Sequence, residues 1–270
     1  MTAATIVALA SGRPPAAIAV IRVSGPAALI AAAALAEGRL PEPRRLSLRR
    51  LVDPADGAVL DQAMLAVFPG PATATGEDLA ELHLHGGQAV IGGVLAALLA
   101  LPGLRLAEPG EFSRRAFANG RLDLAQVEGI ADLIAAETAA QRTQALALTG
   151  GVLSRAADGW RDRCIGILAE AEAALDFAED EADVAERLNE AARSQLHALV
   201  TELDALIADA ARAARIRDGL TIAVTGPPNA GKSSIVNVLS MRDAAIVTPI
   251  AGTTRRGFRP SLRSDPAVWA

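Results

Sequence analysis

Gly226-Pro227-Pro228-Asn229-Ala230-Gly231-Lys232-Ser233 is the stretch that decides the fold of the C-terminal part of this 270-residue chain. It fits the phosphate-binding pattern G-x-x-x-x-G-K-[ST] without a gap. The glycines let successive backbone N–H groups turn towards an anion, and Ser233 offers a hydroxyl to Mg²⁺. Lys232 is the only lysine among 26 basic side chains. Its compact ammonium reaches phosphates beneath a loop where a planar guanidinium does not fit, so the stretch predicts a phosphate site.

The sequence on both sides of this motif agrees with it. Leu220–Val224 is a short apolar run typical of a buried strand, and Ser234–Leu239 carries apolar residues at helical spacing. That helix would direct its positive N-terminal end at the phosphates, which argues against a chance glycine-rich turn. However, only 37 residues follow Ser233, with neither D-x-x-G after the loop nor N-K-x-D. Residues 217–270 are therefore expected to form an incomplete α/β nucleotide-binding fragment.

Residues 1–118 are expected to form a mixed α+β domain. Two apolar stretches flank the turn-rich segment Ser11–Pro15 and predict neighbouring strands. Asp78–His85 alternates apolar and polar residues, as a strand with one buried face does. The predicted strands are Ile6–Ala10, Ile18–Val23, Val59–Phe68, Asp78–His85 and Leu104–Leu106, and the predicted helices are Ala27–Ala36 and Gln88–Leu101.

Residues 119–216 are expected to be all helix. The Ala-rich stretch Leu122–Leu148 is followed by two apolar stripes at spacings of three and four residues. The first stripe is Val152, Ala156, Trp160, Cys164, Ile167, Leu168, Ala171 and Leu175, and the second is Leu196, Leu199, Val200, Leu203, Leu206 and Ile207. The acidic run Glu179-Asp180-Glu181 predicts a solvated connection between them. Its place in the first stripe favours Cys164 as a small core residue over a reactive thiol.

The composition excludes several classes of protein. The net charge is −5, and only five Phe and two Trp are present, which argues against nucleic-acid binding by base-stacking platforms. A single cysteine excludes an internal disulfide and a four-cysteine zinc site. Met1–Ala10 lacks the features of an export signal, and the apolar run Val90–Leu101 is too short to span a bilayer. A soluble cytoplasmic protein without a membrane segment is expected.

Several short motifs, in order along residues 1–255, together resemble one family. They are Thr5-Ile6-Val7-Ala8, Ile21-Arg22-Val23-Ser24-Gly25, Phe68-Pro69-Gly70-Pro71, Thr75-Gly76-Glu77-Asp78, His85-Gly86-Gly87, Pro109-Gly110-Glu111-Phe112-Ser113 and Leu122-Asp123-Leu124-Ala125-Gln126. With them, the sequence resembles the MnmE (TrmE) family of tRNA modification GTPases. Gly226–Ser234 resembles its first GTP motif, and Thr248–Thr254 its switch I and potassium-binding loop. From Arg256 the sequence resembles nothing in the family, so a truncated or frame-shifted product is expected.

The resemblance implies that the first domain binds a formyl- or methylene-tetrahydrofolate donor and forms a homodimer. The matching positions are Arg22, Glu81 and Arg121. A carboxylate such as Glu81 can accept paired hydrogen bonds from a pterin ring, and Arg can hold carboxylate or carbonyl oxygens. Without the resemblance, the strand pattern favours a solvated position for Glu81. Arg121 stands where the family usually has Lys, which keeps the charge and changes the donor geometry.

The resemblance also implies binding of GTP, Mg²⁺ and K⁺. The implied GTP-binding residues are Asn229, Ala230, Gly231, Lys232, Ser233, Ser234, Thr248, Pro249, Ile250, Ala251, Gly252, Thr253 and Thr254. Ser233 and Thr254 are the implied Mg²⁺ ligands, and Asn229, Thr248, Ile250 and Thr253 the implied K⁺ ligands. Oxygen ligands suit such hard cations, and a K⁺ beside the phosphates could neutralise charge as an arginine finger does. Without the resemblance, 248–254 is an ordinary polar loop.

Three functions are compatible with these features. The first is a GTPase that, with the flavoprotein MnmG, adds a carboxymethylaminomethyl-type group to the wobble uridine of certain tRNAs, with folate supplying carbon. The second is a non-hydrolysing folate-binding dimerisation module, since switch II and the guanine-specificity motif are absent. The third is a folate-dependent aminomethyltransferase, whose fold the first domain resembles. GTP turnover in the presence of potassium separates the first two.

Two polar clusters have a functional and a structural interpretation. His83 and His85 share one strand face and could bind a metal, but no third ligand is placed nearby. The arginines at 44, 45, 49 and 50 could contact RNA, although a solvated basic strand is the favoured interpretation.

Overall fold

The computed structural model describes residues 4–176, 182–218, 224–227 and 230–240. The chain divides into two compact units, residues 1–124 and 125–270, and each is described by itself. The division predicted from the sequence, at 118/119 and 216/217, stays a prediction.

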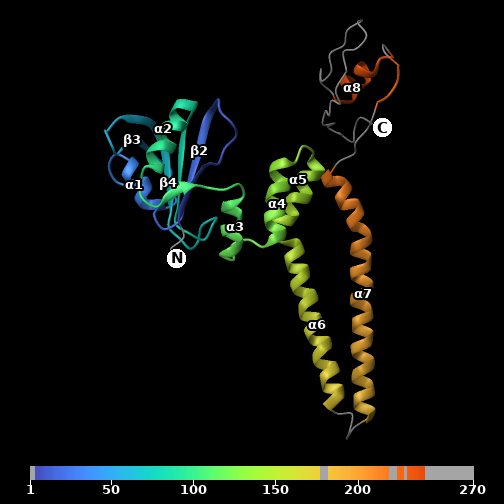
Figure 1. Ribbon diagram of the computed structural model, residues 1–270. Coiled ribbons are helices and arrows are strands. Elements are labelled where there is room, and N and C mark those ends of the chain that lie inside the picture. Colours follow the sequence, from blue (N-terminus) through green and yellow to red (C-terminus); the bar gives the residue numbers. More distant parts are fainter. Residues whose placement is uncertain (1–3, 177–181, 219–223, 228–229, 241–270) are drawn as a thin grey trace. The chain divides into compact units, whose positions relative to one another are not determined.

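The first unit is built on a six-stranded mixed sheet (Figure 1). The strands are β1 (Thr5–Leu9), β2 (Ala16–Ser24), β3 (Ser47–Val52), β4 (Val59–Phe68), β5 (Leu79–Gly86) and β6 (Leu104–Leu106). Their order in the sheet is β3-β4-β5-β2-β1-β6, with β6 parallel to β1 and all other pairs antiparallel. The predicted strands are confirmed, and of the basic segment Arg49 and Arg50 lie in β3 whereas Arg44 and Arg45 precede it.

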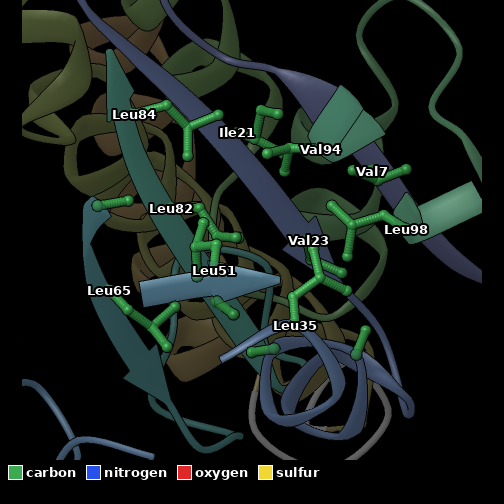
Figure 2. Packing of buried hydrophobic residues seen from close by; sticks show 14 of the residues in the cluster. Val7, Ile21, Val23, Leu35, Leu51, Leu65, Leu82, Leu84, Val94 and Leu98 are labelled. Atoms are coloured by element: carbon green, nitrogen blue, oxygen red, sulfur yellow. The ribbon is translucent and has the colours of Figure 1, made fainter. Parts of the chain in front are cut away.

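One face of this sheet is covered by α1 (Ala28–Leu35) and α2 (Gln88–Leu99). Figure 2 shows Ile21, Leu65 and Leu82 of the strands together with Leu35 and Val94 of the helices in one cluster, and all five are buried. Because side chains alternate along a strand, the residues between these buried positions lie on the other face of the sheet. That second face carries the polar residues of β2 and β5.

A close backbone approach fixes the end of β2 against β1. Gly25 has φ +132, and a Cβ at this position would lie 2.8 Å from the Cα of Thr5. The Thr5 hydroxyl is buried there and accepts a hydrogen bond from the backbone N–H of Ala27 at 2.9 Å, one residue before α1. Only glycine tolerates both the positive φ and the contact, so this position sets where β2 ends and α1 begins.

The described part of the second unit up to residue 218 is helical, as predicted for the middle region of the sequence. The helices of this unit are α4 (Leu124–Ala135), α5 (Ala139–Thr149), α6 (Val152–Asp176), α7 (Ala182–Asp218) and α8 (Lys232–Ser240), and a further helix, α3 (Glu111–Ala118), belongs to the first unit. The Ala-rich stretch Leu122–Leu148, expected to be helical throughout, in fact forms two helices, α4 and α5. Thr138 begins α5 with a capping box, in which its hydroxyl accepts from the Gln141 backbone N–H at 3.2 Å and Gln141 Oε1 accepts from the Thr138 backbone N–H at 3.0 Å.

The long helices α6 and α7 pack on each other along a narrow seam. Ile167, Ala192 and Leu199 are buried in it, with Trp160 packed against them, and the Trp160 indole N–H donates to Glu202 at 2.9 Å. The prediction that Cys164 is a core residue is wrong, because its side chain is exposed. Trp160 and Ile167 lie on the side of α6 that packs on α7, whereas a single partner helix leaves position 164, at the edge of that side, exposed.

Several other stripe residues are also exposed, namely Val152, Leu168, Leu175, Leu196, Val200, Leu206 and Ile207. The apolar stripes therefore predict the helices correctly but overestimate what is buried. The predicted helix Ser234–Leu239 lies within α8 and is confirmed. The acidic connection 179–181 lies outside the described residues, and so does the predicted strand Leu220–Val224 except for Val224, which is in no named helix or strand. No helix in the part of the chain described here combines the length and hydropathy needed to cross a membrane.

Candidate functional site

An ion pair between neighbouring strands lies on the sheet face opposite the α1 and α2 layer. Arg22 of β2 and Glu81 of β5 are direct partners in the strand register. Arg22 donates to Glu81 Oε1 from Nε at 3.0 Å and from Nη2 at 2.7 Å. The side chains are 33% and 19% exposed, so the carboxylate is not solvated as the strand pattern alone suggests. The pair is still open enough for a ligand to reach it.

Two more side chains complete the surroundings of this pair. His83 Nε2 lies 3.3 Å from the second carboxylate oxygen of Glu81. The ring of Phe112, in α3, has its centroid 5.9 Å from Cζ of Arg22, within the range of a cation–π interaction. A carboxylate, a guanidinium, an imidazole and an aromatic ring are thus gathered at one place.

A buried network of charges holds α3, and with it Phe112, against the sheet. Glu111 is 3% exposed and accepts hydrogen bonds from Arg105, Arg115 and the backbone N–H of Glu108. The bonds from Arg105 are the main reason that the pKa of Glu111 falls to about 2, although burial opposes this shift. Arg115 also pairs with Glu77 at 3.0 Å, and this second carboxylate accepts from Ser24 at 2.8 Å.

The third residue of the predicted folate set is attached to a neighbouring loop. Arg121 donates from Nε to the Thr73 carbonyl at 3.0 Å, and Asn119 donates to the Thr75 carbonyl at 2.7 Å. Gly76 has φ +79, and a Cβ there would lie 2.8 Å from Cβ of Asn119. The Thr75 hydroxyl is 2.7 Å from that of Ser24, two residues along β2 from Arg22. The structure thus joins Arg22 to Glu81 directly and ties Arg121 to the loop beside them.

The two strand histidines have separate carboxylate partners. His83 faces Glu81, whereas His85 Nδ1 lies 2.8 Å from Asp61 Oδ1 and its backbone N–H donates to Asp61 Oδ2 at 2.9 Å. Among the described residues, no group of three or more His, Cys, Asp or Glu side chains is placed to hold a metal ion. The metal interpretation of this strand therefore gains no support from the geometry.

The second candidate site is the loop that precedes α8. Gly226 and Gly231 have φ values of +153 and +76, and α8 begins at Lys232. The Lys232 ammonium donates to the Pro227 carbonyl at 2.6 Å, and its other two N–H groups have no partner among the residues that the structure describes. An ammonium next to a helix N-terminus has the charge and the donors that a phosphate requires.

The other predicted nucleotide residues are only partly described. Ala230 and Ser234 are exposed and Ser233 is half-buried at the start of α8. Asn229 and the whole predicted loop Thr248–Thr254 lie outside the described residues, and with them lie every implied potassium ligand and the Thr254 magnesium ligand.

Comparison with known proteins shows which protein family the two units match. Residues 5–121 match the family described as GTP-binding protein TrmE N-terminus, and residues 124–265 match the MnmE helical domain. The chain belongs to the TrmE (MnmE) family. It is 56% identical to the tRNA modification GTPase MnmE of Azorhizobium caulinodans and 60% identical to that of Methylorubrum populi, in each case over 93% of this chain. It is 57% identical to the MnmE of Sphingopyxis alaskensis over 91% of its length. The aligned parts span 57%, 56% and 58% of these MnmE proteins, little more than half of each.

Sequence reasoning missed several residues around the Arg22–Glu81 pair in this MnmE family member. Phe112, Glu111, Arg115 and Glu77 received no role, and α3 is absent from the predicted elements. One signal was available, because Glu111 and Arg115 are four residues apart, as in an ion pair along a helix. Their contacts with Arg105 and Glu77 depend on the tertiary fold and have no local signal.

Proposed function

We propose that this chain carries the folate site and the phosphate-binding loop of a tRNA modification GTPase. In this proposal the GTPase acts with the flavoprotein MnmG to add a carboxymethylaminomethyl-type group to the wobble uridine of certain tRNAs. The main structural support for the folate site is the half-buried Arg22–Glu81 pair beside Phe112. GTP hydrolysis, a tetrahydrofolate one-carbon donor and a homodimer through the N-terminal domain belong to the same proposal. So does the three-part organisation 1–118, 119–216 and 217–270.

The residues of the pair suit a pterin. Glu81 Oε1 accepts from Arg22, whereas the one partner of Oε2 among the described residues is His83, at the longer distance of 3.3 Å. Oε2 can therefore accept hydrogen bonds from a ring N–H and an amino group. Arg22, oriented by Glu81 and by the Phe112 ring, can donate to a carbonyl oxygen of the ligand. We assign Arg121 to an oxygen of the same ligand. When bound, the folate supplies the one-carbon unit.

The loop before α8 suits the phosphates of GTP. Lys232 would exchange its bond to the Pro227 carbonyl for a phosphate oxygen, and the backbone N–H groups at the start of α8 would face the same anion. Ser233 would contribute its hydroxyl to Mg²⁺. The remaining ligands of the proposal are Thr254 for Mg²⁺ and Asn229, Thr248, Ile250 and Thr253 for K⁺.

Titration of the full chain with 5-formyltetrahydrofolate by isothermal titration calorimetry tests the folate assignment. Glu81→Ala should weaken binding about tenfold or more, because it removes a charged acceptor and leaves Arg22 without its partner. Glu108→Ala is the matched control, since Glu108 is 64% exposed and pairs with Arg114 on the surface. Unchanged affinity in Glu81→Ala, or no binding by the unmodified chain, would contradict the proposal.

A second candidate is a non-hydrolysing folate-binding dimerisation module. The sequence favours it at one point, since its single lysine is Lys232 and an N-K-x-D motif cannot occur. GTP turnover measured in KCl and in NaCl decides between the two. Turnover that requires potassium and is lost in Lys232→Ala excludes the module, whereas intact folate binding without turnover excludes the GTPase for this chain.

A further inference from the structure

A cavity of about 690 Å³ opens beside the edge strand β3. Its lining combines three arginines, Arg39, Arg45 and Arg49, with the loop segment Leu40–Glu42 and Ser47. Arg39 and Arg45 are exposed, and Arg49 is half-buried. Three guanidinium groups around one open hollow form a place where an anionic ligand can be held by several donors at once. We call this hollow the β3 cavity.

The segment around the β3 cavity is positively charged, whereas the chain as a whole is acidic. Residues 39–50 contain five Arg and one Glu, a net charge of +4, whereas the whole chain carries −5. The remaining residues therefore sum to −9. Residues 211–270 hold nine basic and three acidic side chains, and the chain outside these two regions is strongly acidic. The segment around the β3 cavity is therefore one of two regions that attract a polyanion.

The segment around the cavity is held in a fixed conformation. Arg44 has φ +64, the only positive φ among the non-glycine residues described. Its backbone N–H donates to the Val67 carbonyl at 2.8 Å, and its guanidinium donates to the Ala72 carbonyl. Such a backbone persists only where surrounding contacts enforce it, and it is typical of ligand-binding loops.

The arginines of the cavity differ in how much of their donor capacity is used. Arg49 donates to the carbonyls of Arg39 and Leu48 at 2.9 and 2.8 Å, and these two bonds fix the position of its guanidinium. Arg45 pairs with Glu42 at 2.8 Å, but both side chains are 74% exposed, so this pair contributes little. The side chain of Arg39 has no hydrogen bond or ion pair within the described residues. Arg39 and Arg45 are therefore available to a ligand.

We propose that the β3 cavity binds the phosphodiester backbone of tRNA. This inference rests on the proposed function, which makes tRNA the substrate. Planar guanidinium groups match phosphate oxygens two donors at a time, and backbone recognition needs none of the aromatic rings that this sequence lacks. Leu40, which is half-buried in the lining of the cavity, adds apolar area beside the arginines for contact with ribose.

The test is the binding of fluorescein-labelled bulk bacterial tRNA to the full chain, measured by fluorescence anisotropy across a range of KCl concentrations. The double variant Arg39→Glu/Arg45→Glu should bind about tenfold or more weakly at low salt, and the slope of log K against log salt should become less steep by roughly 0.7–0.9 for each phosphate that the protein no longer neutralises. The variant Arg39→Gln/Arg45→Gln removes the two charges without reversing them. It should also bind tRNA more weakly than the unmodified chain, but by a smaller factor.

Arg161→Glu is the matched control. Arg161 lies on α6, is 65% exposed and pairs with Asp158 at i,i+3 spacing, as Arg45 does with Glu42. Equal losses of binding free energy per reversed arginine in this control and in the double variant would overturn the proposal, because binding would then reflect total charge alone. Binding of poly-glutamate in preference to tRNA would also overturn it, since the cavity would then fit an acidic protein.

The folate titration separates this inference from the proposed function. The double variant should bind 5-formyltetrahydrofolate as the unmodified chain does, because the Arg22–Glu81 pair is not among the residues that line the β3 cavity. Folate binding with no tRNA binding refutes only the inference about the β3 cavity. Absence of folate binding by the unmodified chain, with tRNA binding still dependent on Arg39 and Arg45, refutes only the folate assignment.

Discussion

Glu111 is charged and almost completely buried, and the hydrogen bonds from Arg105 and Arg115 are what make this possible. Its pKa in the folded chain is about 2, against an ordinary value of 4.5. A lowered folded pKa contributes stability above the unfolded pKa, and this contribution is lost as the pH falls from about 4.5 towards 2. A shift of this size corresponds to about 3 kcal/mol in favour of the folded state.

Glu111→Gln should therefore lower the free energy of unfolding by about 3 kcal/mol at neutral pH and flatten its pH dependence below the ordinary glutamate pKa. Urea unfolding followed by circular dichroism at neutral pH, at about pH 4 and at about pH 3 measures both effects. Glu108→Gln is the control, because its surface pair with Arg114 is worth less than about 1 kcal/mol. Equal behaviour of the two variants would show that the buried network does not stabilise the fold.

Phe112 is expected to orient Arg22 for the folate ligand. A cation–π interaction at a partly exposed site contributes about 0.5–1 kcal/mol, so Phe112→Ala should weaken 5-formyltetrahydrofolate binding about two- to fivefold. Phe117→Ala is the control, because it removes another aromatic ring from the same helix, one that is 53% exposed. This variant should leave the affinity for 5-formyltetrahydrofolate unchanged. Calorimetric titration of both variants decides the matter, and the role assigned to Phe112 fails if the two affinities are equal.

At the residue level, sequence could predict which side chains share a face but not which of them touch. The alternation along β5 places Glu81 and His83 on one side, as the structure confirms. The contact between Arg22 and Glu81, by contrast, joins positions 59 residues apart and depends on the register of β2 against β5. Nothing local in either strand specifies that register, because it follows from the whole sheet.

At the level of elements, strands and helices with strong periodicity were predicted well, and the errors have identifiable causes. The alternating and β-branched runs of β2, β4 and β5 match their predicted ranges closely. The break between α4 and α5 was missed because the Ala-rich stretch has high helix propensity throughout. A signal was present, however, since Thr138 and Gln141 have the spacing of a capping box.

The junction of α4 with the end of α5 depends on a glycine. A Cβ at Gly129 would lie 2.7 Å from the backbone nitrogen of Thr149 and 2.9 Å from Cβ of Leu148. Gly129→Ala should therefore force the two helices apart and lower the free energy of unfolding by about 1–3 kcal/mol, in spite of the better helix propensity of Ala. Thermal unfolding followed by circular dichroism measures the change.

Gly166→Ala, in the same unit, should change the free energy of unfolding in the opposite direction. Gly166 lies on α6 and has no atom within 4 Å of an added Cβ, so the substitution should stabilise the helix by about 0.5–1 kcal/mol. If both glycine variants shift the melting temperature in the same direction, the close approach at Gly129 does not limit the packing of α4 on α5.

At the level of the whole molecule, the sequence predicted a mixed α+β region followed by helices but overestimated the helical core. An apolar stripe shows which side of a helix is buried, yet it does not show how many partners cover that side. Ile167 and Leu199 lie on the seam between α6 and α7, whereas Leu168 and Ile207 belong to the same stripes and are exposed. The two units accordingly have separate cores of very different size.

Separate cores predict separate unfolding transitions. Both tryptophans, Trp160 and Trp269, belong to residues 125–270, so tryptophan fluorescence reports only on that unit. Leu82 is completely buried in the sheet core, and Leu82→Ala should lower the free energy of unfolding of the first unit by about 2–5 kcal/mol. The fluorescence midpoint in urea should stay where it is while the circular dichroism transition of the sheet moves to lower urea. Leu48→Ala, at a strand position that is 60% exposed, should move neither transition. A fluorescence midpoint that shifts together with the sheet transition in Leu82→Ala would mean that the two units unfold as one.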